Sequence, residues 1–275
     1  MIELDKIYNE DCLEGMKRIE DASIDCIICD LPYEVLHKNN PNAKWDRMIP
    51  MEPLWEQYRR VIKERGAILL FCQGMFTARL MMSQPKLWRY NLIWDKCRVT
   101  GFLNANRMPL RCHEDIAVFY KKLPTYNPQY TDGAPSHPQG NGKHKHSNNC
   151  YGEYGRDYQG RTYESVPRVA STVPTGKKCP RSIIPIKKEH ESTVFHPTQK
   201  PVELVRWLIR TYTDEGQTIL DNTIGSGTTA VAAIKEHRHY IGFELNKEYY
   251  DIAQNRINEV LAQPTLDFDN VNPET

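Results

Sequence analysis

Short apolar segments alternate with helix-like segments in two blocks of this chain, residues 1–120 and 191–262. A strand, a helix and a second strand in succession build a parallel sheet with helices on its faces. The predicted strands are Ile24–Cys29, Ala67–Cys72, Tyr90–Trp94, Ile116–Tyr120, Thr218–Asp221 and His239–Glu244. The alternation therefore predicts an α/β fold with a mostly parallel, doubly wound, Rossmann-like sheet.

The predicted helices show apolar residues at spacings of three and four. Residues 52–63 have this spacing, and Gly66 is expected to end that helix as its C-cap. Pro201 is expected to open another helix, since proline is favoured in the first turn. The remaining predicted helices are Thr228–Glu236 and Lys247–Leu261.

Residues 121–190 show little periodicity and carry twelve Lys/Arg against five Asp/Glu. Their local charge is +7, although the whole chain carries only +1. Six tyrosines lie among these basic residues, and this mixture suits backbone phosphates and exposed bases. We therefore predict a nucleic-acid-binding insertion at 121–190 between two halves of one core, 1–120 and 191–262, with a polar tail at 263–275. The alternative is a solvated insertion with no such role.

The cysteine pattern and the apolar content exclude some classes of protein. Cys26 and Cys29 alternate with Ile in a predicted strand, so we expect buried apolar residues rather than a redox or zinc pair. His144, His146 and Cys150 come closer to a zinc pattern, but no second Cys pair at finger spacing accompanies them, and no metal site is predicted. No apolar run approaches the roughly 20 residues that cross a bilayer. We expect no membrane partner and a cytoplasmic location.

The segment ILDNTIGSGTTAVAA, residues 219–233, has the pattern of a strand, a tight turn and a helix. Gly225 permits the turn, and Gly227 is expected to let the backbone approach a ligand. Both fit the dinucleotide pattern GxGxxA, and Glu244 follows about 20 residues later, where an acid binds ribose hydroxyls. The segment predicts an adenosine-containing cofactor and leaves a nicotinamide enzyme open.

Several segments together resemble the amino-methylating DNA methyltransferases of the β, or permuted, class, in which the catalytic motif precedes the cofactor motif. DLPY at 30–33 is similar to the family's DPPY, and DNTIGSGTT at 221–229 is similar to its DPFxGSGTT. HPTQKP and GFELNKEYYDIAQNRI also have counterparts in the family. The resemblance covers most of residues 1–122 and 191–260. It implies methyl transfer from S-adenosyl-L-methionine to the exocyclic N6 of a flipped adenine in double-stranded DNA.

The resemblance also implies a role for each motif residue. Asp30 and the Leu31 carbonyl accept the N–H groups of the target amine, Pro32 keeps Leu31 extended, and Tyr33 stacks on the extruded base. Considered alone, Asp30 has a simpler interpretation as the cap of a strand-to-loop turn. The implied cofactor-binding residues are Asp11, Asp30, His196, Lys200, Asp221, Gly225, Gly227, Thr228, Thr229 and Glu244.

This chain departs from the family pattern at two places. Leu31 replaces the first proline of DPPY, which is compatible with the chemistry because a backbone carbonyl is what that position supplies. Asn222 and Thr223 replace a Pro-Phe pair, which removes a common aromatic residue from the cofactor wall.

The resemblance favours adenine over cytosine, because N4-cytosine enzymes more often begin the catalytic motif with Ser than with Asp. An N4-cytosine methyltransferase is the alternative, and an NAD-dependent Rossmann oxidoreductase is the alternative outside transferases. Double-stranded DNA is the expected partner, and a homodimer and a cognate restriction nuclease are partners that the class suggests.

Within the insertion, phosphate contacts are expected from Lys143, Lys145, Lys177 and Lys178, and guanine contacts from Arg156, Arg161 and Arg168.

Overall fold

The structure is a computed structural model that describes residues 2–33, 47–133, 174, 176–189 and 199–262. The chain divides into two compact units. Unit 1 comprises Met1–Asn127 and Ile183–Thr275, and unit 2 comprises Pro128–Ser182. In the described part of unit 2, β6 (Thr131–Asp132) pairs with β7 (Lys177–Lys178) in antiparallel orientation.

Unit 1 is built on one eight-stranded sheet with the order β1-β10-β9-β2-β3-β5-β4-β8. All neighbouring strands are parallel except β5, which pairs antiparallel with β3 and β4. The strands are β1 (Lys6–Tyr8), β2 (Ile24–Cys29), β3 (Ile62–Cys72), β4 (Trp88–Thr100), β5 (Arg111–Phe119), β8 (Ile183–Pro185), β9 (Thr218–Asp221) and β10 (His239–Phe243). This is the predicted mostly parallel sheet.

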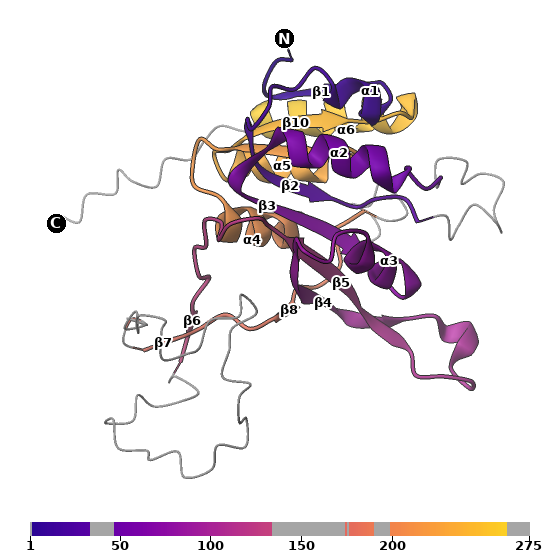
Figure 1. The fold of residues 1–275 in the computed structure, drawn as a ribbon. Helices are drawn as coiled ribbons and strands as arrows, with labels where there is room; N and C mark the ends of the chain where they lie inside the picture. Colours follow the sequence, from indigo (N-terminus) through magenta and orange to yellow (C-terminus); the bar gives the residue numbers. More distant parts are fainter. Residues whose placement is uncertain (1, 34–46, 134–173, 175, 190–198, 263–275) are drawn as a thin grey trace. The chain divides into compact units, whose positions relative to one another are not determined.

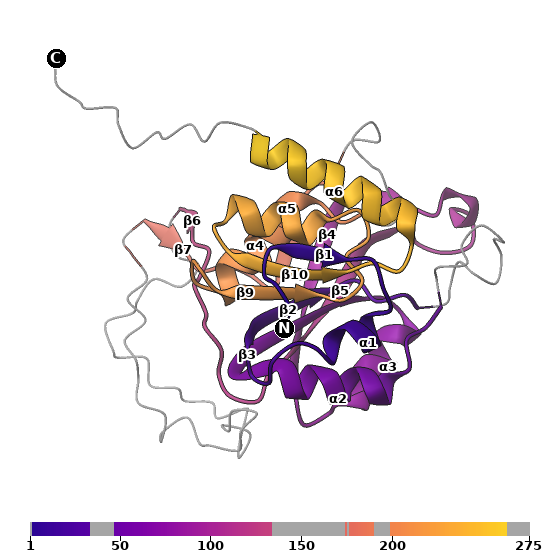
Figure 2. The same ribbon diagram turned by 90° about the horizontal axis from the view of Figure 1, so that it is seen from above.

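Helices cover both faces of the sheet (Figures 1 and 2). One face carries α1 (Cys12–Met16), α2 (Met51–Val61) and α3 (Met75–Ser83), and the other carries α4 (Val202–Tyr212), α5 (Thr228–Lys235) and α6 (Lys247–Ala262). Each helical layer packs its apolar side chains on the sheet and so forms a separate hydrophobic core. The predicted Rossmann-like, doubly wound α/β fold is confirmed.

The strands β2 and β9 are neighbours and run parallel, with Ile27 opposite Leu220. From this pair the chain winds outwards in both directions, through α2 to β3 and through α5 to β10. Ligands of doubly wound sheets bind beside the carboxyl ends of the strands where the winding reverses. A ligand site is therefore expected beside the residues that follow Cys29 and Leu220.

The prediction that Gly66 caps a helix is wrong, because α2 ends at Val61 and β3 starts at the next residue. Gly66 lies inside β3, beside a register shift in its pairing with β2. A Cβ atom at Gly66 would lie 2.8 Å from the carbonyl oxygen of Asp25, so the strand requires glycine for close approach and not for a turn. Ile62 continues the apolar spacing of the helix, and the exposed Lys63–Arg65 that follow show no strand pattern, which hid the boundary.

The strands β4 and β5 are longer than the predicted Tyr90–Trp94 and Ile116–Tyr120. They extend as a two-stranded hairpin that ends in the short 3-10 helix η1 (Phe102–Asn104). The added residues are mostly polar, and almost all are exposed or only partly buried, so they carry no apolar alternation from which a strand could be predicted. No helix in the described ranges is long and apolar enough to cross a bilayer.

Candidate active site

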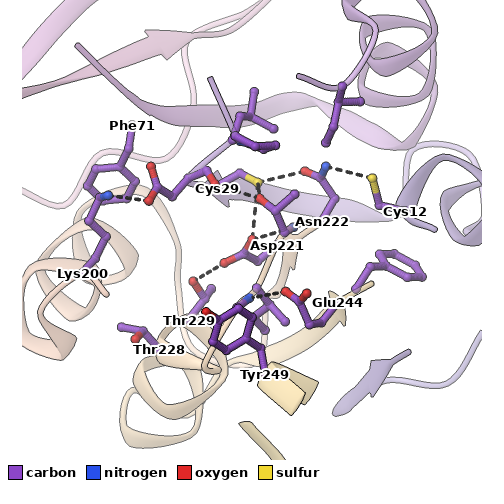
Figure 3. A pocket seen from close by; sticks show the side chains of 18 of the residues that line it. Cys12, Cys29, Phe71, Lys200, Asp221, Asn222, Thr228, Thr229, Glu244 and Tyr249 are labelled. Carbon is purple, nitrogen blue, oxygen red and sulfur yellow. Dashed lines mark hydrogen bonds and ion pairs between the residues drawn. The ribbon is translucent and has the colours of Figure 1, made fainter. Parts of the chain in front are cut away.

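A cavity of about 660 Å³ lies over the adjoining ends of β2 and β9. The segment Asp30–Tyr33 lines one part of it, and Asp221–Ser226 lines another (Figure 3). These are the segments in which the sequence predicts the catalytic and cofactor motifs. The fold brings them together even though about 190 residues separate them in the chain.

Asp30 directly follows β2, and both of its carboxylate oxygens have partners. The Tyr33 hydroxyl donates to Oδ1 at 2.9 Å, and the Lys200 ammonium lies 2.5 Å from Oδ2. Burial raises the pKa of Asp30, the Lys200 charge opposes that rise, and the net pKa lies above the usual value. Leu31 is buried, and the Tyr33 ring packs 4.8 Å from the Phe76 ring, so the segment is held firmly.

Lys200 belongs to a chain of alternating charges that the sequence analysis did not identify. Its ammonium is 3.4 Å from Oε2 of Glu114, and the other Glu114 oxygen is 2.6 Å from the ammonium of Lys96. The Lys200 ammonium also lies 5.1 Å from the centre of the Phe71 ring, a cation–π contact. The order Lys96, Glu114, Lys200, Asp30 balances two acids with two bases inside a buried region.

The same contacts account for the titration of this charge chain. Burial raises the pKa of Glu114, but Lys200 and Lys96 lower it by more, so its net pKa falls below the usual value. Burial lowers the pKa of Lys200, but Asp30 and Glu114 raise it by more, so Lys200 stays protonated. Glu114 could be suspected from the sequence as a site residue, because it is an acid shortly before a predicted buried strand. No feature near Lys96 in the sequence indicates that it belongs to the site.

On the cofactor side, Asp221 and Glu244 end two neighbouring strands. Asp221 is buried and accepts the Thr229 hydroxyl at 2.6 Å and the Thr223 N–H at 3.1 Å. Burial raises the pKa of Asp221 to about 7, although these hydrogen bonds oppose the rise. Glu244 follows β10 and accepts the N–H groups of Gly225 at 2.9 Å and Asn246 at 2.7 Å. Burial raises the pKa of Glu244, and these backbone hydrogen bonds oppose that rise.

The two glycines of the turn have different surroundings. Gly225 has φ +56, lines the cavity, and has open space where a Cβ would stand. Gly227 has φ +83 and begins α5, but a Cβ there would lie 2.9 Å from the Cβ of Ala253 in α6. The structure corrects the reason predicted for Gly227, because its close approach is to a neighbouring helix and not to a ligand.

Most of the other predicted cofactor residues also line the cavity. The Asp11 carboxylate caps α1 by accepting the N–H groups of Leu13 at 2.8 Å and Glu14 at 3.2 Å. His196 lies outside the described residues. The predicted residues that line the cavity are Asp11, Asp30, Lys200, Asp221, Gly225, Thr228, Thr229 and Glu244.

Asn222 and Thr223, which depart from the family pattern, form a buried polar connection between the two motifs. The side-chain amide oxygen of Asn222, Oδ1, accepts the Tyr58 hydroxyl at 2.5 Å and the Cys29 thiol at 3.0 Å. The Thr223 hydroxyl donates to the Asp30 carbonyl at 3.0 Å and therefore ties the cofactor loop to the catalytic segment. An aromatic side chain still lines the cavity beside Glu244, since Tyr249 of α6 lies there (Figure 3).

Two of the seven predicted DNA-binding residues, Lys177 and Lys178, lie in the described part of unit 2, on β7. The Lys177 ammonium lies 2.7 Å from a carboxylate oxygen of Asp132 on β6. The other five predicted DNA-binding residues lie outside the described ranges: Lys143, Lys145, Arg156, Arg161 and Arg168. The three residues weighed as a zinc pattern, His144, His146 and Cys150, also lie outside them. Within the described ranges, no group of three or more His, Cys, Asp or Glu residues is placed to hold a metal ion.

The known proteins with a similar sequence or fold include DNA methyltransferases. A family model for N6 and N4 enzymes, described as DNA methylase, matches residues 24–255. The chain is 27% identical to the Type II methyltransferase M.BglII of Bacillus subtilis, over 91% of this chain and 68% of that protein. Its fold is similar to that of the M1.HpyAVI–SAM complex, with TM-score 0.59, 22% identity and coverage of 92% and 98% of the two chains. It is also similar to the PvuII DNA methyltransferase, described as cytosine-N4-specific, with TM-score 0.60, 13% identity and coverage of 93% and 89%.

Proposed function

Because this chain belongs to the N6/N4 family of DNA methylases, we propose that it methylates the exocyclic N6 of adenine in double-stranded DNA. The observation that carries methyl transfer to a base amine is the cavity shared by Asp30–Tyr33 and the turn around Gly225. The choice of adenine rests on Asp30, because N4-cytosine enzymes more often have Ser at that position. The cavity volume, about 660 Å³, lies within the range of ligand pockets. S-adenosyl-L-methionine is the cofactor, and when bound it supplies an electrophilic sulfonium methyl group.

The residues around Asp30 suit an amine acceptor whose lone pair is delocalised into the base. The Asp30 carboxylate and the Leu31 carbonyl each accept one N–H of the amine, which favours a pyramidal nitrogen with a free lone pair. The same two acceptors stabilise the positive charge that develops on nitrogen during transfer. Because the Thr223 hydroxyl and Lys200 hold this segment before the base arrives, little rearrangement is needed.

The target amine is paired inside the duplex, so the base must leave the stack before it can reach the cavity. Stacking on an aromatic side chain returns about 1–3 kcal/mol per base. The Tyr33 ring lines the cavity, and its hydroxyl is bonded to Asp30. This position supports the proposal that Tyr33 stacks on a base whose amine meets Asp30.

The turn and the strand ends on the other side of the cavity suit the adenosine part of the cofactor. A carboxylate at the end of the second strand accepts ribose hydroxyls in Rossmann-like folds. Glu244 occupies that position, and each of its oxygens has already accepted one backbone N–H, which fixes its orientation. The N-terminus of α5 adds unpaired backbone donors nearby.

Nucleoside mass spectrometry of DNA methylated by the purified protein tests the choice of base. We expect N6-methyladenine, and N4-methylcytosine as the only product would overturn the choice of adenine while leaving the methyltransferase activity in place. An Asp30→Asn variant serves as the inactive control for background methylation. Long-read sequencing of DNA from expressing cells then identifies the sequence around the modified base.

We also propose that residues 121–190 carry target recognition, because their local charge of +7 suits a polyanion. Neutralising one phosphate-binding lysine should lower the salt dependence of DNA binding by about 0.9 per contact. Lys178→Gln is the variant of choice, because Lys177 has a carboxylate partner in Asp132. If removal of residues 128–182, which keeps β8 of the core sheet, leaves the methylated sequence unchanged, recognition lies in the core.

The family suggests three further properties that we propose on its basis alone: a homodimer, a cognate restriction nuclease and a cytoplasmic location. Sedimentation of the purified protein tests the first, since a single species at the monomer mass would contradict it. Protection of expressing-cell DNA against a panel of restriction nucleases tests the second. Cell fractionation tests the third.

A further inference from the structure

The hairpin formed by β4 and β5 extends beyond the strands on either side of it (Figure 1). The pairing of β5 with β3 ends at Asp115, and the pairing of β4 with β8 ends at Asp95. Beyond those residues the two strands pair only with each other, as Thr100 does with Arg111. We name residues 97–111 the hairpin arm.

The tip of the hairpin arm has a defined backbone, although every side chain from 97 to 109 is exposed. Gly101 takes a left-handed conformation with φ +88 and leads into η1. The N–H groups of Arg107 and Met108 both bond to the Asn104 carbonyl, at 2.8 and 3.0 Å. The arm therefore presents its side chains on a structured loop.

Large apolar side chains gather at this tip. Leu103 is 98% exposed, Phe102 70% and Met108 59%. Single exposed apolar residues are ordinary, but a cluster on a projecting element marks an interaction site. Such a cluster favours contact with another molecule.

The charges of the arm favour an anionic partner. Arg98, Arg107 and Arg111 lie on the arm, and the sequence between Asp95 and Glu114 contains no acidic residue. Phosphates attract such a cluster of arginines. Apolar side chains flanked by basic residues are also what proteins insert between base steps when they bend or open a duplex.

The arm continues directly from the walls of the active cavity. Trp94 of β4 and Glu114 of β5 line the cavity, and the buried Lys96–Glu114 pair lies where the arm begins. At a strand rise of about 3.3 Å per residue, β5 extends about 10 Å from Glu114 to Arg111, and the tip lies beyond Arg111. The tip therefore projects from the cavity wall and can reach the duplex around a base held in the cavity.

We propose that the hairpin arm is a DNA wedge, in which the three arginines bind phosphates and Phe102 and Leu103 enter the duplex beside the extruded base. This inference rests on the proposed function, because it takes DNA as the substrate. The wedge occupies space that the base leaves, and so favours the extruded state. It is distinct from the recognition proposed for residues 121–190.

The test compares the double variant F102A/L103A with the matched control L4A/L261A, which removes two exposed leucines outside the arm. Extrusion is measured on a duplex with the sequenced site and 2-aminopurine at the target position, whose fluorescence rises on extrusion. Turnover is measured on the same duplex with adenine at that position, because 2-aminopurine has no N6 amine to methylate. We expect F102A/L103A to lose most of that rise and at least tenfold in kcat/KM for DNA, with unchanged cofactor affinity and Tm. The control should match the wild type.

A second variant, R98Q/R107Q, tests the phosphate contacts. Its DNA affinity should fall on all sequences, and the salt slope should decrease by about 1.8, or 0.9 for each contact. If wild type methylates the adenine duplex and both arm variants behave like the control, the wedge is refuted while the proposed function stands. If the arm variants change only the sedimentation of the protein, the tip is a contact between copies of the chain, and the wedge is equally refuted. If wild type itself transfers no methyl group to DNA, the proposed function fails first.

Discussion

The Lys200 ammonium lies 2.5 Å from the Oδ2 atom of Asp30, and it links the catalytic strand end to the residue just before the cap of α4. Burial raises the pKa of Asp30, and the Lys200 charge opposes the rise. An ionised carboxylate accepts an amine N–H, whereas protonation removes much of that capacity. We therefore regard Lys200 as a positioning residue that keeps Asp30 in its working ionisation state.

Asp30→Asn should lower kcat for methyl transfer by about 100- to 1000-fold, the usual effect of losing one preorganised electrostatic contact. Both asparagine and alanine remove the charge that pairs with Lys200, but Glu114 still balances the ammonium. Asparagine also keeps the shape of the side chain and an acceptor oxygen for Tyr33 and Lys200, so its Tm should fall less than that of Asp30→Ala. Initial rates with labelled cofactor measure the effect, with Asp251→Asn on exposed α6 as the control. Activity within tenfold of wild type would contradict a catalytic role for Asp30.

Lys200→Met should move the acid limb of the pH profile of kcat/KM to higher pH. Removal of the ammonium takes away the interaction that lowers the pKa of Asp30, so the carboxylate ionises only at higher pH. Glu114 keeps Lys96 as a partner in this variant, which protects the fold. The exposed Lys187→Met is the control. An acid limb at the wild-type position would show that Lys200 does not set the ionisation of Asp30.

Glu244→Gln should weaken cofactor binding by roughly 1.5–3 kcal/mol, the range for hydrogen bonds to a charged group, or about 10- to 100-fold in Kd. The amide keeps one acceptor oxygen for the backbone but loses the charge that strengthens a bond from a ribose hydroxyl. Isothermal titration calorimetry with S-adenosylmethionine measures the change. Glu248→Gln, on the exposed side of α6, should bind as wild type does. Equal affinities in the two variants would remove Glu244 from the binding site.

Asp221 should make the stability of the protein depend on pH between about 4 and 7. Burial raises its pKa from 3.8 to about 7, so in this window the folded chain keeps a proton that the unfolded chain has released. The folded state therefore loses stability as the pH rises through the window, and Asp221→Asn removes this contribution. The Tm of the variant minus that of wild type should increase from pH 4 to pH 7 and then level off. A constant difference would mean that Asp221 has an ordinary pKa in the fold.

Gly225→Ala and Gly227→Ala should separate binding from stability. Both glycines are left-handed, and a side chain there costs roughly 1–2 kcal/mol. Gly227→Ala should lose about 1–3 kcal/mol more, because its Cβ would crowd Ala253 of α6. Gly225→Ala should instead weaken cofactor binding, because its Cβ would enter the cavity. Urea unfolding and calorimetry measure the two effects, and equal stability losses would contradict the assignment.

Some elements could be predicted because their boundaries depend on neighbouring residues alone. The strands Ile24–Cys29 and Thr218–Asp221 have the predicted ends, since an apolar run stops in each case at a polar residue or turn. The end of α2 could not be predicted in this way, because the apolar spacing of the helix continues into β3. Nor could the hairpin arm, whose strands are held by pairing with each other and not by a buried face.

The sequence by itself determined the fold class and the two strand ends that carry Asp30 and Asp221, because local periodicity and turn chemistry encode both. Only the tertiary structure decided the charge chain from Lys96 through Glu114 and Lys200 to Asp30, whose members come from four separate segments. The distance between Lys96 and Glu114 depends on the register of β4 with β5, where Trp94 lies opposite Glu114. The distance between Lys200 and Asp30 depends on the path of the chain, which brings Lys200 to the end of β2. Such distances arise from the packing of the whole sheet, and no pattern within a few residues of any one charge specifies them.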